Sequence, residues 1–111
     1  MLLFIAMLQV TPIDTDRLKA DWSEMLEANE KWNDCAFRNI DQINSPRESP
    51  ETIVDAALAQ CRLEESNTKR WMQIAWRGQG MTASDTDFDK IRDDFRQTLI
   101  FVILKARREG R

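Results

Sequence analysis

The chain has 111 residues, of which 42% are hydrophobic and 32% are charged, and its net charge is −3. This length suits a single domain, and the composition is typical of a folded chain. The acidic balance argues against general nucleic-acid binding, so we expect no nucleic-acid partner. Histidine is absent, which excludes Ser-His-Asp triads, Cys-His nucleophile pairs and histidine-containing zinc sites. Two cysteines cannot complete a structural zinc site, so we predict a protein without metal, cofactor or enzymatic activity.

The residue usage predicts an all-α fold. Three glycines and three prolines leave little room for the tight turns of a β-rich chain, and tyrosine, a common strand residue, is absent. The apolar residues recur instead at intervals of three and four, which is the helical period. We therefore expect residues 11–111 to form one helical domain.

Residues 1–10 form an apolar segment interrupted only by Gln9. A membrane-spanning helix needs about 20 such residues, so this segment is too short to span a bilayer. Its length suits the central region of a secretory signal, although a basic start and a clear cleavage site are missing. We predict the remnant of an export signal, which would contact a membrane if it is retained. The alternative is an apolar arm that packs on the domain.

The first helix is predicted to cover residues about 13–44. Thr11 and Pro12 form a start signal, because threonine caps helices and proline suits their first position. The apolar series that follows has helical spacing: Leu18, Trp22, Met25, Trp32, Ala36 and Ile43. Two prolines in the segment SPRESP then end this helix.

The second helix is predicted to cover residues about 50–77. Ser49 is its expected N-cap and Pro50 its first residue. The stretch Glu64–Asn67 is polar on all sides, which leaves open whether it interrupts the helix. Gly78 and Gly80 suit the end of the helix and the loop after it.

The third helix is predicted to cover residues about 86–108. Ser84 or Thr86 is its expected cap, in a capping box with an aspartate three residues further on. The segment Leu99–Leu104 is apolar on all sides, so we expect it to be enclosed or to meet a partner. We place this helix across the open end of the hairpin that the first two helices form.

The two cysteines, Cys35 and Cys61, occupy equivalent positions in the predicted hairpin. If the chain turns near Arg47 and Glu48, both lie equally far from the turn, at a separation that a disulfide bond can bridge. Such a staple would contribute roughly 3 kcal/mol in the chain-entropy model. It would also imply an oxidising compartment, in agreement with the apolar N-terminal segment. The alternative is a pair of reduced, buried cysteines in a cytosolic protein.

The motif WNDC, followed by SPETIVDAALAQC, resembles small exported proteins of Gram-negative bacteria that have no assigned activity. In these proteins a Trp-x-x-Cys helix precedes a proline-capped helix with a second cysteine. The resemblance covers about 30 residues. It implies a periplasmic hairpin with a disulfide bond, and it implies no catalytic or ligand-binding residue.

The segment KRWMQIAWR mixes cations with Trp71 and Trp76. Packing of these tryptophans in an aromatic cluster at the open end of the hairpin is the simpler explanation. If the region is exposed, it would bind another protein together with the third helix. The residues of this predicted partner surface are Trp71, Trp76, Arg70, Arg77, Phe101 and Ile103.

These observations lead to two hypotheses. The first is a small periplasmic or secreted helical protein, stapled by Cys35 and Cys61, that acts in the cell envelope as a non-enzymatic binding or structural module. The second is a cytoplasmic regulatory or adaptor module with reduced cysteines that dimerises through its third helix. The compartment and the oxidation state of the thiols distinguish the two.

Overall fold

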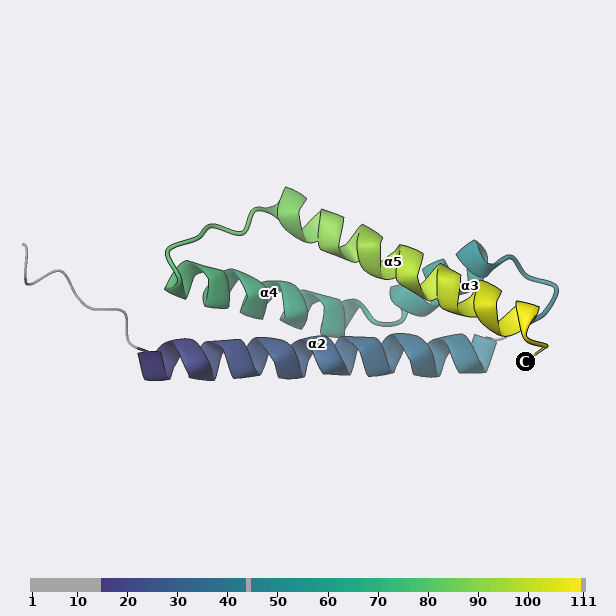
Figure 1. The fold of residues 1–111 in the computed structure, drawn as a ribbon, viewed down its shortest axis with the longest axis horizontal. Coiled ribbons are helices and arrows are strands. Elements are labelled where there is room, and N and C mark those ends of the chain that lie inside the picture. The colour runs from purple at the N-terminus through teal and green to yellow at the C-terminus, as the bar shows by residue number, and fades with distance from the viewer. Residues whose placement is uncertain (1–14, 44, 111) are drawn as a thin grey trace, which may run out of the picture.

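The computed structural model describes residues 15–43 and 45–110, and every regular element within them is a helix (Figure 1). The predicted all-α class is therefore confirmed. The predictions for residues 1–10 and for the Thr11-Pro12 start signal lie outside the described residues. The helices are α2 (Thr15–Ile43), α3 (Pro50–Ala59), α4 (Arg62–Gly78) and α5 (Asp85–Arg108).

Two of the predicted helix starts are confirmed in detail. The Ser49 hydroxyl accepts a hydrogen bond from the Thr52 backbone N–H at 3.2 Å, and Pro50 is the first residue of α3. At the start of α5, Ser84 and Asp87 form a reciprocal capping box, in which each side chain accepts a bond from the other residue's backbone N–H. Such caps satisfy backbone donors that the helix itself leaves unpaired.

The predicted second helix is in fact two helices, α3 and α4. The break lies at Gln60 and Cys61, whose N–H groups donate to carbonyls three residues back, at Ala57 and Leu58. The polar stretch Glu64–Asn67 continues α4 without interruption. No glycine or proline lies between residues 51 and 77, so the sequence carries no breaker signal at this point.

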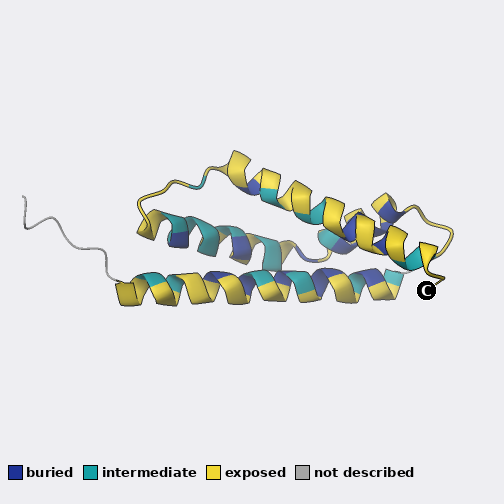
Figure 2. Ribbon diagram, in the orientation of Figure 1, coloured by how far each residue is buried: buried dark blue, intermediate teal, exposed yellow. Residues whose placement is uncertain are grey.

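Helix α2 packs along both α3 and α4. Its buried residues form one stripe on the side that faces these helices (Figure 2): Met25, Ala28, Trp32, Cys35, Ala36 and Ile40. At the far end of α4 the two helices approach closely, because a Cβ atom on Gly78 would lie 2.8 Å from Cδ2 of Leu18. The absence of a side chain on Gly78 thus permits close contact with Leu18, which lies equally far along the chain from the turn between α2 and α3.

The sequence predicts that the last helix lies across the open end of the hairpin. In the structure α5 does not cover the open end of the α2–α4 pair. It packs on α3, and its last turns lie near the turn between α2 and α3 (Figure 1). There Nη2 of Arg107 donates to the carbonyls of Ser45 and Glu48 at 3.1 Å and 2.7 Å. The reason is topological: α4 ends at the open end, so an antiparallel α5 carries its apolar C-terminal half back toward the turn.

The segment Leu99–Leu104 is enclosed on one side only. Leu99, Ile100 and Ile103 join the core with residues of α2 and α3. Phe101 and Leu104 remain 57% and 47% exposed. The core at this end consists of Ala36, Ile40, Ile53, Val54, Ala57, Leu99, Ile100 and Ile103.

Candidate functional site

The two cysteines lie together in a buried cluster between α2 and α4. Cys35 and Cys61 form a disulfide bond, and both residues are buried. The Asn39 amide donates to the carbonyl of Cys35 at 2.8 Å, and its nitrogen lies 3.4 Å and 3.5 Å from the two sulfurs. A bonded and buried pair of this kind offers no thiolate for chemistry, so its role is structural.

A carboxylate lies beside this pair. Ligand atoms of Cys35, Cys61 and Glu64 all fall within 4.8 Å of one another. Glu64 follows Cys61 by about one helical turn. A structural zinc site needs four ligands with free thiolates, whereas here both sulfurs share one bond. The grouping is therefore not a metal centre in the oxidised protein.

An aromatic cluster packs together with the two buried cysteines. The Trp32 ring stacks on Phe88 at 5.8 Å and meets Phe95 edge-on at 4.7 Å, which joins α2 to α5. Nζ of Lys69 lies 5.8 Å from the centre of the Phe88 ring. The sequence predicts this cluster at the open end, around Trp71 and Trp76. The connection from α4 back to α5 places Phe88 and Phe95 over Trp32 instead.

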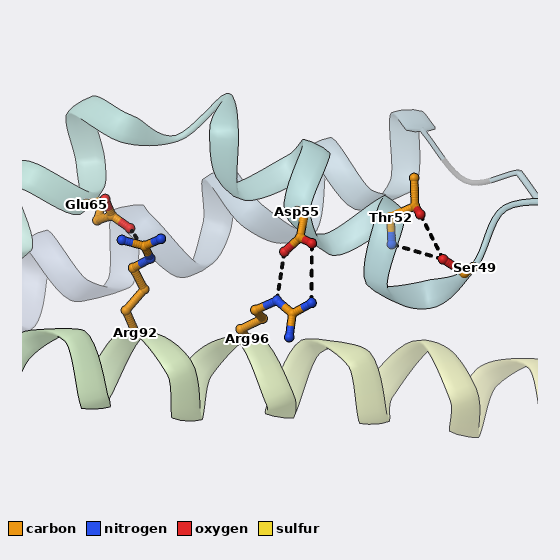
Figure 3. Close-up of polar contacts among 6 residues, drawn as sticks. All are labelled: Ser49, Thr52, Asp55, Glu65, Arg92 and Arg96. Carbon is orange, nitrogen blue, oxygen red and sulfur yellow. Dashed lines mark hydrogen bonds and ion pairs between the residues drawn. The ribbon is translucent and has the colours of Figure 1, made fainter.

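A charged groove of about 740 Å³ separates α5 from the junction of α3 and α4. Arg96 donates two hydrogen bonds to Asp55, at 2.7 Å and 3.2 Å, and Arg92 lies 3.4 Å from Glu65 (Figure 3). Cationic and acidic side chains are equal in number along its walls, so they cancel rather than attract one kind of ion. The residues that line it are Asp55, Leu58, Ala59, Arg62, Glu65, Ser66, Arg92, Asp93 and Arg96. The two ion pairs across the groove hold α5 against α3 and α4.

The Asp55–Arg96 pair gives a prediction about acid sensitivity. The hydrogen bonds from Arg96 lower the pKa of Asp55 below its ordinary value of 3.8. A carboxylate with a lowered folded-state pKa stabilises the fold above the ordinary pKa, and this stabilisation is lost as the pH falls through the lowered value. Because the pair is partly exposed, solvent screens its charges, and we expect only a small coupling free energy at neutral pH.

The coupling should be measured with a double-mutant cycle of Asp55→Asn and Arg96→Gln, using urea unfolding between pH 7 and the acid limit of the fold. The coupling should fall toward zero below the ordinary pKa of aspartate. A coupling that stays constant through the acid range would show that the pair does not contribute through its charge.

The predicted partner surface is not one surface. Trp71 and Trp76 are partly buried on α4, whereas Arg70 and Arg77 are exposed. On α5 Ile103 is only 7% exposed and belongs to the core, so its assignment to an exposed surface is wrong. The C-terminal ends of α4 and α5 lie at opposite ends of the molecule (Figure 1), and the two parts of the predicted surface are therefore separated.

Phe101, the remaining residue of that prediction, lies on a face that combines apolar and cationic side chains. It is followed at helical spacing by Leu104, Lys105 and Arg108, and all four residues are exposed. We call these four residues the α5 outer face. The sequence alone does not indicate this face, because an all-apolar segment gives no signal of which side is buried.

Comparison of the chain with protein-family models found no matching model. Comparisons with curated proteins and with solved structures likewise found no match. Among the described residues, no helix combines the length and the apolar character that crossing a membrane requires.

Proposed function

We propose that this protein is a small exported helical module that binds another protein in the cell envelope and has no enzymatic activity. The α2 helix and the α3–α4 segment form the stapled hairpin, and the α5 outer face is the binding surface. The partner surface is apolar and acidic, to match Phe101, Leu104, Lys105 and Arg108.

The observation that carries the proposal is the composition of the α5 outer face. Exposed apolar side chains that lie next to each other and are bordered by charged residues mark interaction sites, whereas single exposed apolar residues do not. Phe101 is 57% exposed and Leu104 is 47% exposed, and the two cations lie one turn away. An aromatic anchor beside cations is a common pattern in protein interfaces.

The buried Cys35–Cys61 bond supports the choice of compartment. Disulfide bonds persist mainly in exported proteins, because cytosolic reductants keep thiols reduced. The apolar residues 1–10 agree with export. The absence of histidine from the chain supports a binding role over acid–base or nucleophilic catalysis.

The test has two parts, each on protein produced in its native host. The first is the intact mass with a thiol count before and after reduction. We expect no free thiol, two thiols after reduction and a mass that lacks the N-terminal residues. Two free thiols with a full-length mass would instead favour the cytoplasmic adaptor hypothesis.

The second part is crosslinking in intact cells, followed by identification of the partner by mass spectrometry. Phe101→Ser combined with Leu104→Ser should abolish the crosslinked product. Leu63→Ser is the matched control, because Leu63 on α4 is 70% exposed and lies outside the α5 outer face. Equal loss with both variants, or no effect of the paired substitution, would contradict the proposed surface.

A further inference from the structure

Helix α2 carries a second exposed face, which no contact described so far uses. Three of its large apolar side chains remain exposed: Trp22 at 40%, Leu26 at 52% and Phe37 at 41%. They lie on one side of the helix together with polar residues at helical spacing. We call this face the α2 outer stripe, and it consists of Lys19, Trp22, Leu26, Glu30, Asn33, Phe37 and Asp41.

The N-terminal half of the stripe is hollowed, and its C-terminal half carries an exposed aromatic side chain. A shallow hollow of about 360 Å³ lies beside Trp22 and Leu26, with Leu18 and Gln79 also in its wall. Phe37, in the other half of the stripe, is 41% exposed. One face therefore carries both an apolar hollow and an aromatic ring of a size that can enter it.

The order of residues along the stripe makes it complementary to a second copy of the same stripe that runs in the opposite direction. Trp22 and Phe37 lie at nearly equal distances on either side of Glu30, and Lys19 and Asp41 lie at equal distances further out. If two α2 helices pack antiparallel, each Phe37 meets the other helix's Trp22. Each Lys19 then meets the other helix's Asp41. Neither Lys19 nor Asp41 has an ion-pair partner within the part of the chain that the structure describes.

We propose that the α2 outer stripe binds a second copy of this chain, in an antiparallel twofold contact between the two α2 helices. A twofold contact uses the same patch on both copies, so the patch must be self-complementary, as this one is in both shape and charge. The two hollows receive the two Phe37 rings, and two Lys19–Asp41 pairs close the ends. This contact does not use the α5 outer face. The test of the dimer is therefore independent of the test of the proposed binding function.

The contact has one unfavourable feature, which distinguishes it experimentally from other modes of association. Glu30 lies at the centre of the stripe, so the two Glu30 carboxylates approach each other at the twofold axis. Like charges that face each other across an interface weaken the association. Replacing Glu30 with glutamine should therefore strengthen association, which neither a parallel contact in another register nor a contact through α5 predicts.

The experiment is sedimentation equilibrium of the full, disulfide-bonded chain over a concentration series. We expect a reversible monomer–dimer equilibrium, and Phe37→Glu should weaken the dimer by at least about tenfold, because it places a charge in the apolar hollow. Lys19→Glu and Asp41→Lys should each weaken it by roughly fivefold. The double variant should restore the wild-type equilibrium, since it reverses each pair without removing it.

Phe101→Glu on α5 is the matched control, because it introduces the same charge at a similarly exposed ring outside the stripe. A dimer that Phe101→Glu disrupts and Phe37→Glu does not would assign the interface to α5 and overturn the proposal. A full chain that stays monomeric to millimolar concentration would also overturn it. If such a monomer dimerises once residues 1–14 are removed, those residues occupy the hollow in place of a second copy. Circular dichroism of each variant should show wild-type helix content, which separates loss of association from loss of fold.

Discussion

Cys35→Ser and Cys61→Ser should each lower the melting temperature by a similar large amount, and the double variant should cost little more than either single one. The bond closes a loop of about 25 residues, which corresponds to roughly 3 kcal/mol in the chain-entropy model. For a domain of this size that is about 10–20 °C. The effect is large because a small domain buries a limited core and has a small net stability.

Thermal unfolding followed by circular dichroism measures this effect. Reduction of the wild-type protein should lower its melting temperature to that of the double variant, which itself should not respond to the reductant. Single-variant effects that add in the double variant would show that the two cysteines are not bonded to each other. The Cα atoms are 6.0 Å apart, a separation at which a disulfide bond forms without backbone movement.

Trp32→Ala should lower the free energy of unfolding by about 3–5 kcal/mol. The Trp32 side chain is 1% exposed and contacts both Phe88 and Phe95. Its removal leaves a cavity at the point where α2 meets α5, next to the two buried cysteines. The matched control is Trp22→Ala on the same helix, where the side chain is 40% exposed. At a protein concentration that keeps the chain monomeric, we expect this variant to lose less than about 1 kcal/mol.

Urea unfolding, followed by the change in helix content, measures both values. Trp32→Phe adds a second comparison. The Trp32 Nε1–H group is buried and has no hydrogen-bond partner among the described atoms, and an unpaired buried donor is itself unfavourable. Trp32→Phe removes that donor and keeps a ring, so it should cost much less than Trp32→Ala. Equal losses for Trp22→Ala and Trp32→Ala would contradict the packing of α2.

The features that the sequence predicts correctly are local. The all-α class follows from apolar spacing, and the starts of α3 and α5 follow from Ser49-Pro50 and from Ser84 with Asp87. These signals work because a cap satisfies backbone groups within one turn of itself. The proximity of Cys35 and Cys61 is also predictable, since two prolines locate the turn and helical geometry then determines which residues face each other.

The sequence could not show where α5 lies or which sides of its apolar segment are buried. Phe101 and Ile103 are both apolar and only two residues apart, yet one is exposed and the other is in the core. The same limit applies to Trp22 and Trp32, both placed by their spacing on one apolar stripe, although Trp22 is 40% exposed and Trp32 is 1% exposed. Composition and spacing thus determined the helical class, the caps of α3 and α5 and the proximity of the cysteines, but not the break between α3 and α4. The exposed apolar side chains form the two surfaces that we propose for binding. Only the tertiary structure decided which apolar side chains remain exposed to water, because burial depends on the position of the neighbouring helices.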